Sequence, residues 1–249
     1  MQLLTTESEI EQMSKTPQSA AIIPGPGFRI RTTFERPSKE VIDRIAAFET
    51  PDVSDLLNRM FTMNGDISGV VDGCRVAGPA LTVKVYPGDN LMVHKALDLI
   101  QPGDVVVIDT SESNKNAVLG DLITNKAKHK GVAGFVIDGL VRDIDQVRDS
   151  GIPVFCRGIT PFGPLHRGPG ELNHSISCGG IVVEPGDIIT ADNSGIVVVR
   201  RDYAERLAEK LEAKSAALAD YIENVKKGIF SQEWVDTLLA QTKCSIDED

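Results

Sequence analysis

Three short apolar runs in the middle of the chain constrain its fold more than any other feature. They cover residues 105–108, 134–137 and 153–155, and no charged residue interrupts them. Runs of this kind are typical of strands that are covered on both faces. Segments with helical character, at about 116–130 and 144–148, separate them. The alternation predicts βα units and a partly parallel sheet, so the fold class is α/β.

The flanking segments predict helices before this core and a β-rich part after it. Ser38 is a suitable N-cap for a first helix, and Thr50-Pro51-Asp52 is typical of the start of a second. A long amphipathic helix is expected over residues 202–227, followed by a short one at 234–239. Further strands are expected at 81–86, 181–183, 188–189 and 196–199, and a helix at 91–100.

These patterns divide the chain into three parts. Residues 1–35 are polar and interrupted by Pro and Gly, and we interpret them as an N-terminal extension. Residues 36–201 form the α/β domain, and residues 202–249 form a helical tail that packs on the core or on a neighbouring subunit. Pro-Gly-Asp occurs three times, starting at Pro87, Pro102 and Pro185, and suits a type II turn better than a catalytic role.

Charge and cysteine content exclude several classes of function. The chain carries 26 Lys and Arg against 36 Asp and Glu, a net charge of −10, with no basic cluster for nucleic acid. No apolar window is long enough to cross a membrane, and the start has no basic leader, so we expect a cytoplasmic protein. The four cysteines form no CxxC pair, and Cys156 and Cys178 are expected to be buried thiols.

The candidate site lies in residues 116–122 and 138–143. Gly120-Asp121 falls at the opening of a predicted helix, where free backbone N–H groups attract anions. Arg142-Asp143 follows the strand at 134–137, and ligands of α/β sheets bind beyond such strand ends. An acidic protein that binds a carboxylate substrate needs this local positive potential. The same stretch contains Asp138, which could act on a metal or on Arg142, or close a turn with Gly139.

This combination suits cleavage of a carbon–carbon bond next to a 2-oxo group. The reaction leaves an enolate, whose negative charge must be stabilised. A hard divalent cation held by carboxylate and water oxygens acts as a Lewis acid, and a guanidinium gives bidentate donation to the substrate. A second carboxylate can orient a water that transfers protons. The four histidines show no metal-ligand spacing, and the segment around His166 is interpreted as a loop that is a candidate for lining an entrance.

Asp121, twenty intervening residues and then Arg142-Asp143 match the signature of a known family. Over roughly residues 38–226 the chain resembles the RraA-like proteins. That family includes class II pyruvate aldolases acting on 4-hydroxy-4-methyl-2-oxoglutarate and 4-carboxy-4-hydroxy-2-oxoadipate. Further segments that support the resemblance lie at 50–55, 78–83, 87–90, 131–134, 153–155, 185–187 and 191–195.

The resemblance implies a role for each matching residue. Asp143 would hold Mg2+ or Mn2+ largely through waters, and Arg142 would bind the pyruvyl unit and stabilise the enolate. Asp121 would orient a proton-shuttling water, and the backbone amides of residues 119–122 (Leu119, Gly120, Asp121 and Leu122) would receive the substrate carboxylate. The implied fold is a β/β/α swivelling, phosphohistidine-like core with N-terminal helices and a long C-terminal helix. Family members assemble as trimers or hexamers with sites between subunits.

One departure leaves the exact reaction open. In aldolase members an acidic residue of a neighbouring subunit's C-terminal helix reaches the metal, within a run like R-E-A-K-E. Here the run is Leu211-Glu212-Ala213-Lys214-Ser215, which keeps only Glu212 as the candidate acid. Oxaloacetate decarboxylation, which uses the same pyruvate enolate, therefore stands beside retro-aldol cleavage. The alternative from another class is a protein-binding regulator of a ribonuclease, for which Arg142 and Asp143 would be dispensable.

Overall fold

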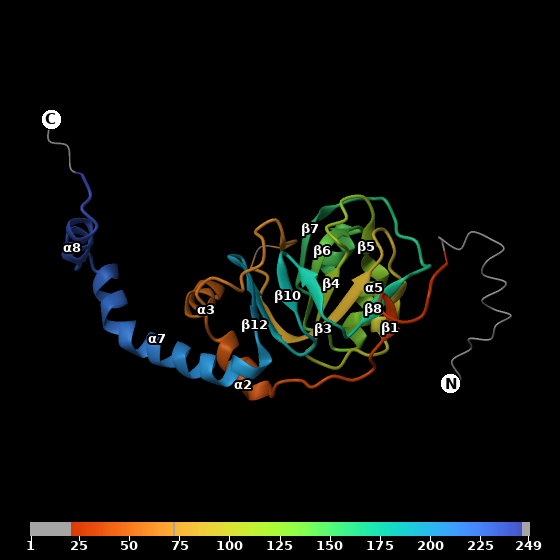
Figure 1. The fold of residues 1–249 in the computed structure, drawn as a ribbon, viewed down its shortest axis with the longest axis horizontal. Helices are drawn as coiled ribbons and strands as arrows, with labels where there is room; N and C mark the ends of the chain where they lie inside the picture. Colours follow the sequence, from red (N-terminus) through yellow and green to blue (C-terminus); the bar gives the residue numbers. More distant parts are fainter. Residues whose placement is uncertain (1–20, 72, 246–249) are drawn as a thin grey trace. The chain divides into compact units, whose positions relative to one another are not determined.

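The fold was examined in a computed structural model that describes residues 21–71 and 73–245. The chain divides into two compact units, of which the first runs to Ala208 and the second begins at Glu209. The first unit contains the sheet and most helices, and its ribbon is shown in Figure 1. Residues 1–20, which make up most of the predicted N-terminal extension, lie outside the described residues.

A parallel four-stranded core positions everything else in the first unit. It consists, in spatial order, of β3 (Val76–Val85), β4 (Val105–Asp109), β6 (Gly134–Val141) and β7 (Val154–Ile159). Each neighbouring pair in this order is parallel. The apolar runs of the sequence form these strands because their side chains are buried on both faces of the sheet. The prediction of an α/β fold with a partly parallel sheet is confirmed.

Shorter strands extend this core at its edges. β8 (Gly170–Leu172) pairs antiparallel with β3, and β1 (Phe28–Ile30) pairs parallel with β8. β2 (Ser68–Gly69) borders β7, and β5 (Ala117–Leu119) pairs parallel with the end of β6. The first half of β3 also pairs with β11 (Ile188–Asp192), which forms a hairpin with β12 (Gly195–Val199). A separate two-stranded sheet joins β9 (Ile176–Cys178) to β10 (Ile181–Val183).

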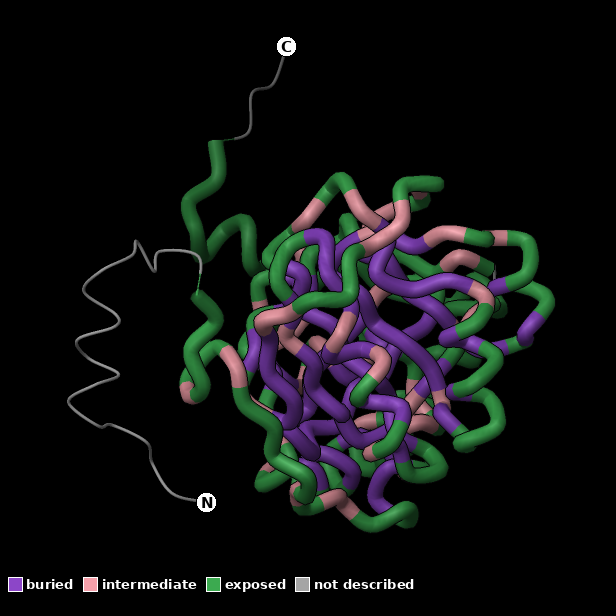
Figure 2. Tube along the Cα trace, turned by 90° about the vertical axis from the view of Figure 1, so that its right-hand side faces the viewer, coloured by how far each residue is buried: buried purple, intermediate pink, exposed green. Residues whose placement is uncertain are grey.

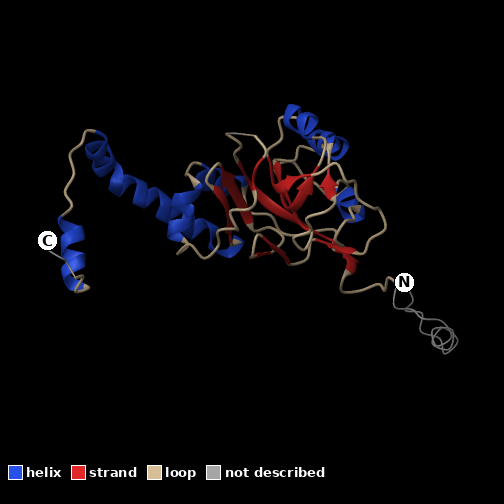
Figure 3. Ribbon diagram, turned by 90° about the horizontal axis from the view of Figure 1, so that it is seen from above, coloured by secondary structure: helices blue, strands red, loops and turns tan. Residues whose placement is uncertain are grey.

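The alternation of side chains along the central strands builds two apolar layers. In β4, Val106 and Ile108 belong to one buried cluster, while Val105 and Val107 belong to the other. Helices α4 (Leu91–Ala96), α5 (Asp121–His129) and α6 (Ile144–Asp149) cover the first layer. Strands β9 to β12 cover the second. Figure 2 shows the buried chain running through the centre of this unit, and Figure 3 shows helices flanking its strands.

Helices α2 (Lys39–Ala46) and α3 (Thr50–Leu56) precede the sheet, as predicted. The Ser38 side chain accepts the Val41 N–H at 3.3 Å, which confirms the first N-cap. Thr50 is not the cap of α3, however, because Glu49 takes that position. The Thr50 hydroxyl instead donates to Asp192 Oδ1 at 2.6 Å and ties the helix to the end of β11.

The three Pro-Gly-Asp segments are turns, as predicted. Gly88, Gly103 and Gly186 have φ of +83°, +93° and +89°, a conformation that favours glycine. The aspartates that follow are buried and accept backbone N–H groups at 2.8–3.0 Å. The pairs are Asp89 with Leu91, Asp104 with Gln101, and Asp187 with Glu184. The motif therefore fixes turns and is not itself a reaction centre.

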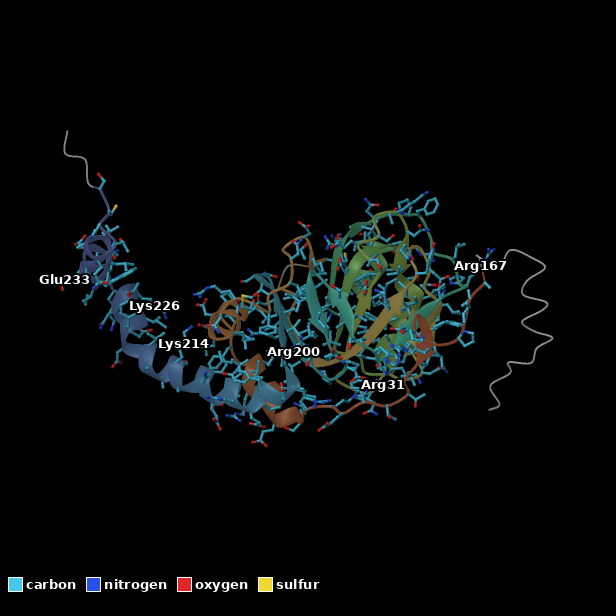
Figure 4. The ribbon with its side chains drawn as sticks, viewed as in Figure 1. Arg31, Arg167, Arg200, Lys214, Lys226 and Glu233 are labelled. Carbon is cyan, nitrogen blue, oxygen red and sulfur yellow. The ribbon has the colours of Figure 1, made fainter. Side chains whose placement is uncertain are left out.

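The second unit consists of helix segments beyond residue 208. α7 (Ala204–Lys226) begins in the first unit after a 3-10 turn (Arg201–Tyr203), and α8 (Glu233–Gln241) follows it. Lys214, Lys226 and Glu233, labelled in Figure 4, belong to this unit. Among the helices that the structure describes, none combines the length and the apolar character needed to span a bilayer.

Candidate active site

The two halves of the Asp121 and Arg142-Asp143 signature meet because they follow neighbouring parallel strands. β5 ends at Leu119, directly opposite Val141 at the end of β6. The Arg142 N–H continues this pairing and donates to the Leu119 carbonyl at 3.0 Å. Gly120-Asp121 and Arg142-Asp143 therefore leave the same end of the sheet side by side, and the twenty residues between Asp121 and Arg142 contain the rest of α5 and the whole of β6. This strand-helix-strand unit explains the spacing.

The sequence prediction missed the boundaries of these elements. A single helix was expected over about 116–130, but Ala117–Leu119 forms β5 and the helix begins only at Asp121. The three residues of β5 are fully buried and apolar, so pairing with β6 prevails over helix formation. β6 was expected to end at residue 137, but it continues to Val141 and so includes Asp138 and Gly139.

Gly120 is required for space and not for backbone conformation. Its φ of −152° is extended and open to any residue. A Cβ at this position would lie 2.5 Å from Asp143 Oδ2 and 3.1 Å from Arg142 Cγ. Any side chain here would displace the two signature residues. The glycine thus allows the chain entering α5 to pass directly against the Arg142-Asp143 pair.

Asp143 holds an unusual backbone conformation next to this glycine. Its φ is +53° and its ψ is +45°, in the left-handed region that residues other than glycine rarely adopt. Such outliers persist where the surrounding structure holds them, and they concentrate at functional sites. The left-handed turn connects β6 to α6, and Asp143 Oδ2 lies 3.2 Å from Arg142 Nε. Both side chains remain partly open, at 36 % and 40 % exposure.

A second glycine confines the other side of Arg142. A Cβ on Gly163 would lie 2.8 Å from Arg142 Nη1. Arg142 also borders a cavity of about 180 Å3 that faces the start of α5. Four other predicted site residues line this cavity: Leu119, Gly120, Asp121 and Leu122. Val118 and Ile123, from the same segment, also line it. The remaining lining residues come from two other segments: Asn90 and His94, and Pro164 and His166.

The N-terminus of α5, where an anion site was predicted, lies at the cavity wall. No side chain caps this helix, so its first N–H groups have no side-chain acceptor. Thr124 fastens the turn from within, since its hydroxyl donates to the Gly120 carbonyl at 2.9 Å. The helix dipole adds partial positive charge at the same point. A carboxylate in the cavity would thus meet helix amides on one side and Arg142 on another.

Three polar residues of the cavity were not among the predicted site residues. His166 Nδ1 lies 2.6 Å from Asn90 Oδ1, and the rings of His94 and His166 are in edge contact, with centroids 5.3 Å apart. Burial lowers the pKa of His94, with further lowering from His166 and Lys126. These residues come from 87–94 and from the loop before β8. Only the position of His166 in a Gly- and Pro-rich loop gave a signal in the sequence.

Asp138 does not join Arg142. It points to the same face of β6 as Val136, toward β9 and β10, because side chains alternate along a strand. Its Oδ1 accepts a hydrogen bond from Arg157 Nε, and its Oδ2 accepts the Gly179 N–H at 2.7 Å. Hydrogen bonding to Asp138 raises the pKa of Arg157. Glu212 lies on α7 in the second unit, and its contribution to a neighbouring site stays a prediction.

The open corner at Asp143 fits a largely hydrated divalent ion. Among the described residues, no group of three or more His, Cys, Asp or Glu side chains is arranged to hold a metal. Mg2+ retains several waters and needs only one or two carboxylates, so a single aspartate beside a cavity is a sufficient protein contribution. Gly120 keeps the space next to Asp143 Oδ2 free of side-chain atoms, as the 2.5 Å approach of a Cβ there indicates.

The structure defines a mixed α/β protein with a cavity at the ends of parallel strands, lined by Arg142 and the uncapped start of α5. The model of the RraA-like family, described as Aldolase/RraA, matches residues 50–198, and the chain belongs to that family. A Halalkalibacterium halodurans protein provisionally named 4-hydroxy-4-methyl-2-oxoglutarate aldolase is 39 % identical over 182 residues. The match covers 72 % of this chain and 87 % of the relative.

Solved structures agree with this family. An uncharacterised protein from Pseudomonas syringae pv. tomato aligns with a TM-score of 0.70 and 29 % identity, covering 78 % of this chain and 96 % of the other. Streptomyces coelicolor RraAS2, described as an unusual member of an RNase ES inhibitor family, aligns with a TM-score of 0.70 and 28 % identity. That alignment covers 76 % of this chain and 98 % of the other. The resemblance inferred from the sequence is confirmed.

Proposed function

We propose that this chain is a divalent-metal-dependent lyase that forms a pyruvate enolate. Its reaction is retro-aldol cleavage of substrates of the 4-hydroxy-4-methyl-2-oxoglutarate type, with oxaloacetate decarboxylation as a second reaction through the same enolate. Family membership and the provisional names of relatives support the aldolase class. The observation that carries the proposal is the meeting of Arg142 and the uncapped start of α5 at one cavity, with Asp143 Oδ2 lying 3.2 Å from Arg142 Nε.

The residues around the cavity divide the work. The first amides of α5 bind the substrate carboxylate, and Leu119, Gly120 and Leu122 shape that end of the cavity. Arg142 donates to the 2-oxo oxygen and stabilises the charge that develops there, as preorganised donors do in many enzymes. Gly120 and Gly163 hold its guanidinium in place. Asp121 orients a water that gives a proton to the enolate carbon.

Mg2+ or Mn2+, held by Asp143 and waters, would supply Lewis-acid stabilisation of the same oxygen. We place Glu212 of a neighbouring subunit as a further acidic group for that site, which requires a homo-oligomer, either a trimer or a hexamer. The substrate is a small oxo acid in the cytoplasm, and neither nucleic acid nor a membrane is a partner. Light scattering on a size-exclusion column would measure the oligomeric state and test this arrangement.

The central test is pyruvate release in a coupled assay. We expect release from 4-hydroxy-4-methyl-2-oxoglutarate, from oxaloacetate or from both in the presence of Mg2+ or Mn2+, and loss of release with chelator. Asp143→Asn should raise the Mg2+ concentration for half-maximal activity by about 10- to 100-fold, the range typical of impaired metal sites. Asp145→Asn, at an exposed neighbouring aspartate, is the matched control. No release from either substrate with any metal would refute the proposal.

A second candidate function follows from the likeness to Streptomyces coelicolor RraAS2. We propose as the alternative that the chain binds and restrains a ribonuclease without essential catalysis. This role would leave binding unchanged in Arg142→Ala, because the signature residues would have no part in it. Measuring inhibition of RNA cleavage by wild type and Arg142→Ala separates the two functions. Inhibition by both proteins, without pyruvate release by either, would favour the alternative.

A further inference from the structure

The wall of the cavity formed by His166, Asn90 and His94 has no part in the mechanism above. The loop carrying His166 is held on both sides of the histidine. The Leu165 N–H donates to the Gly88 carbonyl at 2.8 Å, and the Arg167 N–H donates to Asp89 Oδ2 at 2.5 Å. Arg167 is labelled in Figure 4, at the end of this loop. His166 is therefore presented to the cavity from a fixed loop.

Hydrogen bonds around Asn90 determine which nitrogen of His166 carries a proton. The Asn90 amide nitrogen donates to the Val118 carbonyl at 3.1 Å, which fixes the orientation of the amide. Its oxygen therefore faces His166 Nδ1 at 2.6 Å and can only accept. Nδ1 must carry the proton. In the neutral ring, Nε2 is then left with its lone pair, ready to accept a proton.

We propose that His166 is the base that removes the proton from the 4-hydroxyl group of the substrate, with Asn90 as its positioning residue. The inference rests on the proposed lyase function and deepens it. Arg142 and His166 both line the cavity. In the proposed arrangement the 2-oxo oxygen of the substrate lies at Arg142, and its 4-hydroxyl lies along the wall that includes His166. The ligand class for this wall is thus a 2-oxo acid with a hydroxyl on carbon 4.

The step balances without any further reactant. The hydroxyl proton passes to His166 Nε2, the oxygen–carbon bond becomes a carbonyl, and the bond between carbons 3 and 4 breaks. Its electron pair moves into the enolate at carbons 2 and 3, and carbon 3 then receives a proton. Oxaloacetate carries no 4-hydroxyl, so its decarboxylation to the same enolate requires no base at this position. The two reactions therefore differ in their need for His166.

This difference gives the experiment. His166→Asn retains an N–H donor near the Nδ1 position for Asn90 but removes Nε2. Both reactions are measured with Mg2+ for wild type, His166→Asn, His166→Gln and the control His129→Asn, which changes an exposed histidine at the end of α5. In both His166 variants kcat/KM for aldol cleavage should fall about 100-fold or more, the usual contribution of a general base. Oxaloacetate decarboxylation should stay within about threefold of wild type.

The decarboxylation rate also reports that each variant folds and retains the Arg142 corner. An equal loss of both reactions would overturn the inference, because His166 would then act only on structure or on the shared pyruvyl end. Unchanged aldol cleavage in both variants would overturn it as well. If the wild type decarboxylates oxaloacetate but cleaves no 4-hydroxy substrate, the role of His166 is refuted while the proposed lyase function stands. Absence of both reactions in wild type would instead refute the proposed function itself.

Discussion

Two aspartates, one within β6 and one just after its end, each pair with an arginine, but the two pairs differ in how far they are exposed. Asp138 pairs with Arg157 of β7, and their side chains are only 4 % and 15 % exposed. Asp143 pairs with Arg142 at 3.2 Å, with 36 % and 40 % exposure. The two aspartates thus lie five positions apart, in β6 and just beyond it, yet one belongs to a pair buried in protein and the other to a pair whose arginine lines a cavity.

The surroundings explain the difference. The carboxylate of Asp138 has partners on both oxygens, and next to it Asp109 pairs with Lys84 at 2.5 Å. Both oxygens of the Asp138 carboxylate therefore have protein partners, which stabilises one arrangement of the pair. Around Arg142, by contrast, two glycines leave space, and Asp143 holds a left-handed backbone. An Arg–Asp pair therefore does not identify a site by its residue types. The Arg142–Asp143 pair is distinguished by its exposure and by the space around it, which leave both side chains accessible to a ligand.

The largest effect on the free energy of unfolding is expected at the buried pair of Asp138 and Arg157. Asp138→Ala leaves the Arg157 Nε–H and the buried Gly179 N–H without their acceptor, while Asp66 and Glu112 still pair with the other guanidinium nitrogens. Removing one partner of a buried ion pair typically costs about 3–5 kcal/mol. Guanidinium unfolding should show a loss of that size for the variant. Asp145→Ala, whose side chain is 84 % exposed, should change the free energy of unfolding by less than about 0.5 kcal/mol.

The next largest effect is expected on kcat/KM and comes from the more exposed pair, Arg142 and Asp143. Arg142→Ala removes the donor to the developing enolate, so kcat/KM for pyruvate release should fall about 100- to 1,000-fold. Its free energy of unfolding should change by no more than about 1 kcal/mol, since the pair is exposed. Arg59→Ala, at a 73 % exposed arginine, serves as the activity control. A large loss of stability without loss of kcat/KM would reverse the contrast between the two corners.

A smaller effect should follow from crowding the guanidinium without removing it. In Gly163→Ala the new Cβ would lie 2.8 Å from Arg142 Nη1, so the arginine must shift by several tenths of an ångström. Misplacement of a catalytic group on this scale should lower kcat/KM about tenfold. Gly65→Ala is the matched control, because nothing lies within 4 Å of its Cβ. Equal rates for the two variants would show that the position of Arg142 tolerates displacement.

Much of the sheet was predictable because its strands are apolar runs with buried side chains. The sequence also indicated that Gly120, Asp121, Arg142 and Asp143 belong together, first from a predicted helix start beside a strand end and then from the resemblance to a family. The physical reason for their spacing is the pairing of β5 with β6, and β5 was predicted as helix. Three residues carry too little periodicity to separate strand from helix, so tertiary pairing had to decide.

The histidine wall could not be predicted for a different reason. Asn90 and His166 are 76 residues apart, and the contact between them depends on the loop before β8 returning to the turn at Gly88. Hydrogen bonds between loops follow no periodic pattern in the sequence. Asp138 shows the converse. It lies close to Arg142 in the sequence, but its side chain faces β9 and β10 from within β6, where it meets Arg157, whereas Arg142 follows the end of the strand.

The smallest effect concerns the thiol of Cys156, in the apolar layer on the face of the sheet opposite the Asp138–Arg157 pair. Cys156 precedes Arg157 on β7, and burial raises its pKa to about 11 from a usual value of 9.0. The folded state therefore keeps the proton between about pH 9 and 11, while the unfolded chain releases it. Stability is highest below pH 9 and falls as the pH rises through this window, because unfolding then releases protons. For this group alone the loss from pH 8 to pH 10 is about 1 kcal/mol.

Guanidinium unfolding of wild type and Cys156→Ala at pH 8 and pH 10 isolates this contribution. The substitution changes packing by the same amount at both pH values. The effect of the thiol is therefore the difference between the two proteins in how much the free energy of unfolding falls from pH 8 to pH 10. We expect the loss between pH 8 and pH 10 to be about 1 kcal/mol smaller in Cys156→Ala. Parallel losses in the two proteins would mean that solvent reaches Cys156. The apolar layer that contains Cys156, which backs the strands carrying Asp138 and Arg157, would then be open to solvent.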